Sequence, residues 1–138
     1  MPDVLIDTSF LVALNSKQDK YHSASVEYAF SARAEFLIPD IALTEVAYLI
    51  KRDVGEQGVT ALIERLVRTD ALLQPLLLVD LERAREIMIA YPKAKFDFVD
   101  SCIMALAERL NIRQICTFDR RDFSIFKPIH CDYLELLP

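Results

Sequence analysis

The sequence predicts an α/β protein, a three-layer α/β/α sandwich with a central, mainly parallel sheet. Two observations lead to this prediction. Short apolar runs alternate along the chain with longer segments whose apolar residues recur at helical spacing, and strands that alternate with helices form parallel sheets covered on both faces. The length of 138 residues, without a repeat, linker or low-complexity stretch, fits a single domain over residues 1–138.

The chain opens with a predicted strand and a predicted helix. Val4 to Ile6 form a short apolar run that ends at Asp7. Thr8 or Ser9 is then placed to cap a helix, because a side-chain oxygen there accepts a hydrogen bond from a free backbone N–H of the first turn. The apolar residues of this helix are Phe10, Leu11, Val12 and Leu14.

A second helix, a second strand and a third helix follow. Residues 21–33 are expected to be helical, and the apolar residues 36–38 form a strand that Pro39 stops. Asp40 is a natural N-cap for a helix over residues 41–54. The buried stripe of that helix consists of Leu43, Val46, Ala47 and Ile50.

The only two glycines of the chain mark its middle. Gly55 and Gly58 bracket a turn that leads into a helix over residues 59–69. Residues 76–79 are then predicted to form a strand, and residues 81–91 a helix.

The last third of the chain is expected to contain one long helix and two further strands. The helix covers residues 97–111, and its core face consists of Val99, Ile103, Leu106 and Leu110. Residues 114–118 form a strand, residues 120–126 a short turn or helix, and residues 133–137 a closing strand.

Two aspartates stand directly after predicted strands. Asp7 follows the first strand, and Asp119 follows the strand over residues 114–118. Ligands of open parallel sheets bind outside the carboxyl ends of the strands, so both carboxylates are expected at one edge. Helix capping explains each aspartate taken alone. The two together favour a functional site.

Glu45 and Asp100 are the other acids of the expected site. The neighbours of Glu45 at helical spacing are Ile41, Ala42, Tyr48 and Leu49. Its carboxylate therefore lies on no polar face and is expected to be protonated, paired or metal-bound, with a position at the rim of the helix as the alternative. Asp97 and Asp100 share one side of a helix start, where Asp97 is assigned mainly to capping and Asp100 to the site.

Carboxylates gathered in this way need a cation. Two charges ~4 Å apart repel by roughly 4 kcal/mol at an effective dielectric near 20, against a domain stability of about 5 to 15 kcal/mol. Oxygen ligands favour Mg²⁺ or Mn²⁺ over zinc, and His22 and His130 are too separated to form a zinc motif. A carboxylate-held Mg²⁺ activates water and stabilises a leaving oxygen, so hydrolysis of a phosphodiester is the expected reaction.

Further polar residues are expected around these acids. Thr8, Ser9 and Thr117 are placed to hydrogen-bond a metal-bound water or a phosphate, and capping or strand-end hydrogen bonds are the equal alternative. Asp122 stands three residues after Asp119. It is a candidate to bind the metal ion through a bridging water, although a side chain exposed to solvent is the stronger expectation.

The net charge of −5 argues against a broad basic surface for nucleic acid. If the protein acts on RNA, the attraction must be local. The candidate phosphate contacts are Arg120 and Arg121, with Lys51 and Arg52 on the third helix. Solvated surface charge is the alternative for each of them.

Cysteine content and hydropathy bear on compartment and partners. Cys102, Cys116 and Cys131 are an odd number without CxxC spacing, as expected of reduced cysteines in a cytoplasmic protein. No signal peptide is recognised, and the most apolar tract, residues 71–81, is too short to span a membrane. The mean hydropathy of +0.21 predicts an oligomer or partner interface.

Four segments, taken in order, resemble the PIN domain. They are IDTSFLVAL, LTEVAYLI, FVDSCIMALAERLNI and ICTFDRRDF. The resemblance spans nearly the whole chain, and the group it is most similar to is the VapC-type toxins of toxin–antitoxin pairs, which are single-domain Mg²⁺-dependent endoribonucleases.

The resemblance implies an acidic site onto which Asp7, Glu45, Asp100 and Asp119 map one by one. Asp7 and Asp100 are then the principal metal ligands, and Asp119 completes the ligand shell or orients water. Glu45 positions or deprotonates the attacking water. A homodimer and a cognate antitoxin that covers the active groove are also implied, and the apolar helices over residues 41–69 are where we expect these contacts.

Three alternatives stay open at this point. An RNA-processing nuclease of the PIN family has the same acidic site. An aspartyl-phosphate phosphatase that uses Asp7 is disfavoured, because the sequence DTS lacks a second aspartate two residues further on. A non-catalytic binding module in which the acids are only helix caps is predicted to show no binding of Mg²⁺ or Mn²⁺ at these carboxylates.

Overall fold

The computed structural model describes residues 2–138. Within this range a five-stranded sheet has the order β3-β2-β1-β4-β5, and every strand pairing is parallel. The strands are β1 (Asp3–Ile6), β2 (Glu35–Pro39), β3 (Leu72–Gln74), β4 (Gln114–Cys116) and β5 (Glu135–Leu137). The predicted α/β class with a parallel sheet is confirmed.

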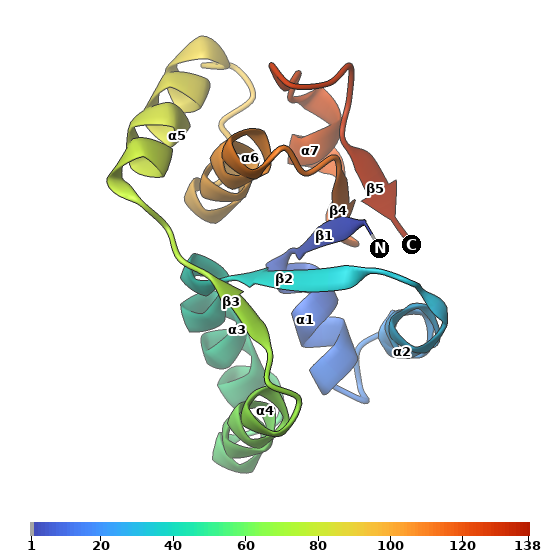
Figure 1. Cartoon of the computed structure of the whole chain (residues 1–138). Coiled ribbons are helices and arrows are strands. Elements are labelled where there is room, and N and C mark those ends of the chain that lie inside the picture. Colours follow the sequence, from blue (N-terminus) through green and yellow to red (C-terminus); the bar gives the residue numbers. More distant parts are fainter. Residues whose placement is uncertain (1) are drawn as a thin grey trace.

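Helices cover both faces of the sheet (Figure 1). One layer contains α1 (Thr8–Asn15), α2 (His22–Ser31), α3 (Asp40–Asp53) and α4 (Glu56–Arg68). The other contains α5 (Leu78–Ala90), α6 (Phe98–Leu110) and α7 (Arg121–Ile125). None of the helices described within residues 2–138 combines the length and the apolar character needed to cross a membrane.

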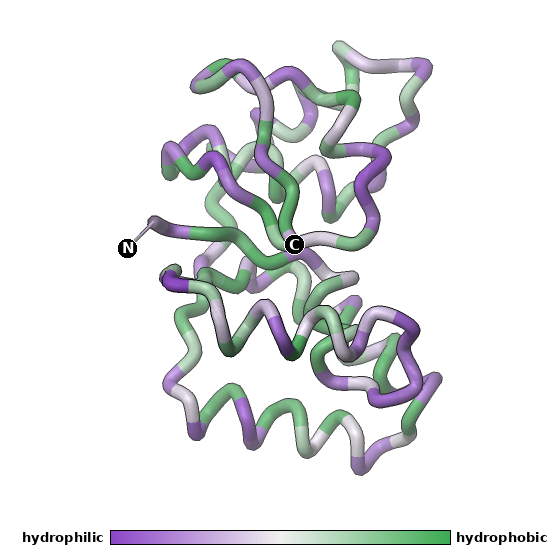
Figure 2. The backbone as a smooth tube through the Cα atoms, turned by 90° about the vertical axis from the view of Figure 1, so that its right-hand side faces the viewer, coloured by the Kyte–Doolittle hydropathy of each residue, from purple (hydrophilic) through white to green (hydrophobic). Residues whose placement is uncertain are grey.

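The side chains of the central strand β1 point alternately to the two faces of the sheet, so the core has two parts. Val4 and Ile6 of β1 pack with residues of α1, α3 and α4, whereas Leu5 packs with residues of α5, α6 and α7. Successive side chains of a strand point to opposite faces, so an unbroken apolar run marks a strand buried on both sides. In Figure 2 the tube turns green just after the N-terminus, where β1 enters the molecule.

Two helix caps differ from the prediction. Asp7, rather than Thr8 or Ser9, is the N-cap of α1, and its Oδ1 accepts a hydrogen bond from the Thr8 N–H at 2.7 Å. Asp40 is the first residue of α3 rather than its cap. Its Oδ1 instead accepts a hydrogen bond from the backbone N–H of Leu76 at 3.1 Å, which ties α3 to the segment after β3.

The predicted strand over residues 76–79 is wrong. The third strand is Leu72–Gln74, and α5 already begins at Leu78. The reason is a local cap: the Asp80 carboxylate accepts a hydrogen bond from the Leu77 N–H at 2.8 Å, which starts the helix inside the apolar run.

The helix α4 also begins earlier than predicted. It starts at Glu56, directly after Gly55, whose φ of 107° lies in the region that favours glycine. Gly58 lies inside the helix, and a Cβ at this position would stand 2.7 Å from Cγ1 of Val54. Gly58 therefore permits a close approach to the end of α3 and does not form part of a turn.

Candidate active site

The carboxyl ends of β1 and β4 lie side by side at the centre of the sheet. Ile6 is in register with Cys116, and the Asp7 N–H donates to the Cys116 carbonyl oxygen at 3.0 Å. Asp7 is only 2% exposed, whereas Asp119, on the loop after β4, is exposed. Parallel pairing thus brings together two acids that are 112 positions apart, from 119 − 7.

The Asp7 carboxylate is held by three hydrogen bonds. Its Oδ1 accepts the Thr8 N–H, and its Oδ2 accepts the hydroxyls of Thr117 at 2.7 Å and Ser9 at 3.0 Å. Burial, together with the negative charge of Asp119, nevertheless raises the pKa of Asp7 to about 6. Three donors therefore do not compensate the desolvation of this carboxylate, which a nearby cation would stabilise.

Ser9 and Thr117 join the start of α1 to the loop after β4. Their hydroxyl oxygens lie 3.2 Å apart. The Ser9 Oγ accepts the Phe118 N–H at 2.9 Å, and the Thr117 Oγ1 accepts the Asp119 N–H at 3.0 Å. The two side chains therefore fix Asp7 and position Asp119 beside it.

Asp100 lies in the first turn of α6 and is 6% exposed. Burial raises its pKa to about 9, and the charge of Asp7, a hydrogen bond with Asp122 and the charges of Asp122 and Asp97 act in the same direction. Asp7 and Asp100 are thus electrostatically coupled. Without a cation, the protonated form of at least one of them is favoured.

Asp122 is buried, so the expectation of a solvated side chain is wrong. Its Oδ2 accepts the Asp97 N–H at 3.0 Å, and its Oδ1 accepts Nη1 of Arg121 at 2.7 Å. Burial follows from the packing of α7 against the start of α6, which the i, i+3 relation to Asp119 does not reveal. Asp122 therefore supports the segment that carries Asp100.

Asp97 occupies the N-cap position of α6, but its side chain makes no capping hydrogen bond. Its carbonyl oxygen accepts the N–H and the Oγ–H of Ser101, each at 2.9 Å, which closes the first turn of the helix. The predicted position of Asp97 at the helix start is confirmed, and the predicted capping by its side chain is wrong. The exposed Asp97 carboxylate adds negative charge near Asp100.

Glu45 is half-buried on α3. Within residues 2–138 its carboxylate has no hydrogen bond or ion pair. Leu49, one turn further along the same face, lines a cavity together with Ser9 and Asp119. The face of α3 that carries Glu45 is thus directed toward the loop of Asp119, although within residues 2–138 no hydrogen bond joins Glu45 to the other three acids.

The two arginines expected to bind phosphate are engaged within the chain. The Arg120 guanidinium donates to the carbonyl oxygen of Pro138, and Arg121 donates to Asp122 and to the Ala94 carbonyl oxygen, each at 2.7 Å. A phosphate would have to compete with these hydrogen bonds.

The fit of a divalent ion follows from the donor groups. No three acidic, histidine or cysteine side chains are already arranged as a metal site in the described part of the chain, residues 2–138. The groups beside Asp7 and Asp100 are oxygen donors, the charges of this pair are unbalanced, and the Thr8 hydroxyl is buried without a hydrogen-bond partner. These features fit a hard cation such as Mg²⁺ or Mn²⁺.

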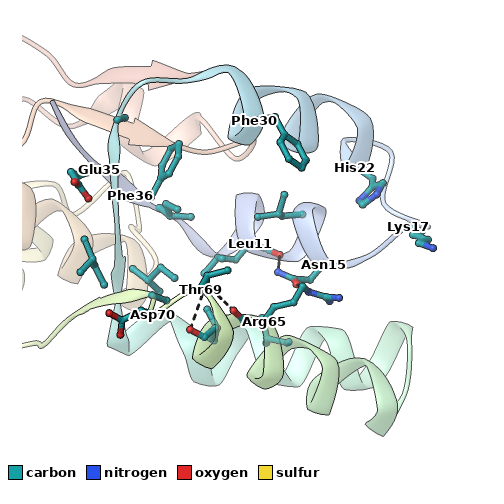
Figure 3. Close-up of a pocket in the computed structure, with 18 residues that line it drawn as sticks. Leu11, Asn15, Lys17, His22, Phe30, Glu35, Phe36, Arg65, Thr69 and Asp70 are labelled. Atoms are coloured by element: carbon teal, nitrogen blue, oxygen red, sulfur yellow. Dashed lines mark hydrogen bonds between the residues drawn. The ribbon is translucent and has the colours of Figure 1, made fainter. Parts of the chain in front are cut away.

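A larger cavity lies among α1, α2, α4 and β2 (Figure 3). Its volume is about 750 Å³, and its walls are mainly apolar, with Leu11, Phe36 and Leu62 among them. Phe30, at 88% exposure, stands beside it. The Arg65 Nε donates to Oδ1 of Asn15 at 2.9 Å across this space. None of the four candidate acids lines it.

Comparison with known proteins identifies the family. The model of the PIN domain matches residues 4–127. Ribonuclease VapC26 of Mycobacterium tuberculosis is 27% identical over 135 residues, which cover 98% of this chain and 100% of that protein.

Solved structures show the same fold. VapC20 of M. tuberculosis, described as a Sarcin-Ricin loop cleaving toxin, superposes with a TM-score of 0.83 at 22% identity, covering 94% of this chain and 98% of that one. VapBC2 of Rickettsia felis, bound to a DNA fragment from its promoter, superposes with a TM-score of 0.69 at 17% identity, covering 96% of each chain. By the match over nine-tenths of its length, this chain belongs to the PIN domain family.

Proposed function

We propose that this protein is a metal-dependent endoribonuclease that uses Mg²⁺ or Mn²⁺, and that it is the toxin of a VapBC-type toxin–antitoxin pair. The observation that supports this most strongly is the buried, coupled pair Asp7 and Asp100 at the carboxyl edge of the sheet, with Asp119 beside it. The similarity to a relative named as a ribonuclease supports the choice of RNA as substrate.

In this proposal Asp7 and Asp100 hold the ion, and Asp119 completes its ligands or orients a water. A bound divalent ion would neutralise the two carboxylates, bind a phosphate oxygen and lower the pKa of a water. Thr117 and Ser9 keep Asp7 in one orientation through their hydrogen bonds of 2.7 and 3.0 Å.

Glu45 is assigned to the activation of the attacking water. Its half-buried carboxylate has no partner within residues 2–138 and is therefore free to accept a proton. The water gives a proton to Glu45 as its oxygen bonds to phosphorus, the bond to the leaving ribose oxygen breaks, and that oxygen takes up a proton from solvent. Glu45→Gln should keep metal binding and lose cleavage, which separates its role from that of the ligands.

We further propose an antitoxin as protein partner and a homodimer. The 750 Å³ cavity offers an apolar surface of the kind that a partner segment covers, and Tyr48, Ile63 and Val67 leave apolar surface exposed on α3 and α4. Similar folds include a toxin-antitoxin complex from Klebsiella pneumoniae, at a TM-score of 0.66. The fold similarity makes a comparable partner reasonable for this chain.

Cleavage of total RNA in Mg²⁺ or Mn²⁺ tests the activity. Asp7→Asn and Asp100→Asn should each abolish cleavage and bind less Mn²⁺ in calorimetry, whereas Asp132→Asn, an exposed acid at the far edge of the sheet, should change neither. Full activity in either active-site variant would refute the role assigned to that residue.

Expression in cells separates the toxin from an RNA-processing nuclease. The wild-type protein should stop growth, and coexpression of the protein encoded by the neighbouring gene should restore it. Unimpaired growth, combined with RNA cleavage in vitro, would favour the processing nuclease.

A further inference from the structure

A small cavity adjoins the candidate active site. Its volume is about 330 Å³, and Tyr21, Phe118, Val12 and Leu49 are among the residues that line it. We propose that this cavity binds one unpaired nucleobase of the RNA strand, next to the phosphodiester that is cleaved. The inference deepens the proposed ribonuclease function and rests on it.

The position of the cavity relates it to the reaction. Ser9 and Asp119 line it, and both also belong to the hydrogen-bonded group around Asp7. A ligand in the cavity therefore lies against Asp119, itself a candidate metal ligand, and against Ser9, which donates to Asp7. The base of a nucleotide next to the cleaved phosphate has to lie this close to the acids that are proposed to hold the metal ion.

An anchored stack of aromatic rings forms one wall. The Tyr21 ring lies parallel to the Phe118 ring with centroids 4.4 Å apart, and Phe118 stacks on Phe10 at 5.7 Å. Phe10 is 1% exposed, whereas Tyr21 is 38% exposed. The core thus fixes a partly accessible ring, and such rings bind bases of single strands by stacking, because every base has a π-face.

The other walls suit the apolar faces and polar edges of a base. Val12 and Leu49 are apolar, and Asp19 and Asp53 supply acceptors at the rim. A pocket with apolar walls and a few polar groups is typical of small-ligand sites.

Two exposed cations supply local positive charge. Nζ of Lys20 lies 5.0 Å from the centroid of the Tyr21 ring, and Arg52 pairs with Asp53 at 2.8 Å. Both pairs are solvent-exposed and weak, so a base can displace Lys20 from the ring at small cost. The displaced ammonium and Arg52 are then available to the phosphates on either side of the base, in a chain whose net charge is −5.

A random-sequence, single-stranded RNA pool tests the proposal. Cleavage in Mg²⁺, followed by sequencing of the new ends, gives the base preference at each position. Tyr21→Ala should lower kcat/KM by about 5- to 100-fold, mainly through KM, and weaken the preference at one position beside the cut. Tyr21→Phe should retain both, as should Tyr133→Ala at an exposed tyrosine that does not line the cavity.

Arg52→Ala provides a second variant that leaves the aromatic stack intact. It should raise KM several-fold, and the effect should shrink in high salt. Arg85→Ala is its matched control, because Arg85 is also exposed and pairs with a neighbouring carboxylate on a helix. Arg52→Ala decides the question if Tyr21→Ala fails to fold.

The outcomes separate the two levels of inference. Unchanged kinetics and base preference in Tyr21→Ala and Arg52→Ala, with wild-type cleavage intact, would overturn the base pocket and leave the ribonuclease proposal standing. Loss of antitoxin binding alone in these variants would identify the cavity as a protein contact and also overturn it. A wild-type protein that cleaves no RNA would overturn both.

Discussion

At the scale of single residues, the site is governed by the cost of burying charge. Asp7 and Asp100 are almost fully buried, and burial raises the pKa of both, although Asp7 accepts three hydrogen bonds; the charge of Asp7 raises the pKa of Asp100 in addition. Such an arrangement is unfavourable for the apoprotein at neutral pH and becomes favourable when a cation neutralises it. Stability and metal binding are therefore linked at these two positions.

The pH dependence of unfolding should reveal this linkage. The ordinary pKa of 3.8 applies to the unfolded chain, and folding raises the pKa of Asp7 to about 6 and that of Asp100 to about 9. Between the unfolded and folded values the native state binds more protons, so its stability falls as pH rises. Urea unfolding in EDTA should show a decline from pH 4 toward pH 9.

The variant Asp100→Asn isolates this contribution. It should flatten the decline in EDTA, and it should reduce the stabilisation that Mg²⁺ gives the wild-type protein at high pH. Asp132→Asn serves as control. An unchanged pH profile in Asp100→Asn would show that the two buried acids are not the linked groups.

The hydroxyl of Thr117 allows a second test at this scale. It donates to Oδ2 of Asp7 at 2.7 Å, and a hydrogen bond to a charged group contributes about 1.5 to 3 kcal/mol. Thr117→Val keeps the shape and should lower kcat for RNA cleavage by roughly 10- to 100-fold. Thr60→Val, at an exposed position of α4, should leave kcat unchanged. An equal loss of kcat in both variants would show that Thr117 does not act by positioning Asp7.

At the scale of elements, the prediction of structure from sequence failed where a capping side chain or a tertiary contact overrides the apolar pattern. The runs 4–6 and 114–118, each followed by an acid, were correctly predicted to lie in strands, although β4 ends at Cys116. The run over residues 76–79 looks the same in composition but starts a helix, because Asp80 caps it. Asp122 was misjudged for a related reason: its burial depends on how α7 packs against α6, and no local pattern records that contact.

The connection between α5 and α6 yields a prediction about stability. Asp80 is 1% exposed, and its two oxygens accept Nε and Nη2 of Arg109 at 2.7 and 3.0 Å. Removal of one partner leaves the other uncompensated, so Arg109→Met should lower the free energy of unfolding by about 3 to 5 kcal/mol. Urea unfolding measures this, with Arg85→Met in an exposed pair as a control that should change little.

At the scale of the whole molecule, the parallel sheet determines which residues can meet. The strand order places β1 and β4 side by side, so residues 7 and 119 converge at its carboxyl edge, and α6 adds residue 100 from the opposite layer. The alternation of strands and helices predicted the parallel sheet and the carboxyl edge, but not the strand order that makes β1 and β4 neighbours. It did not predict the cavities either, because their walls combine side chains from α1, α2, α3, α4 and several loops whose packing the sequence pattern does not specify.

The separation of the two cavities predicts that partner binding and catalysis can be uncoupled. The 750 Å³ cavity beside Phe30 touches none of the candidate acids, and its apolar walls are proposed to receive an antitoxin segment. Phe30→Glu places a charge beside this apolar surface and should prevent the complex while RNA cleavage continues. Coexpression with the neighbouring gene product and size-exclusion chromatography with light scattering would measure this. Ile129→Glu, at an exposed apolar residue in the loop after α7, should still form the complex. A complex that survives Phe30→Glu would place the antitoxin elsewhere.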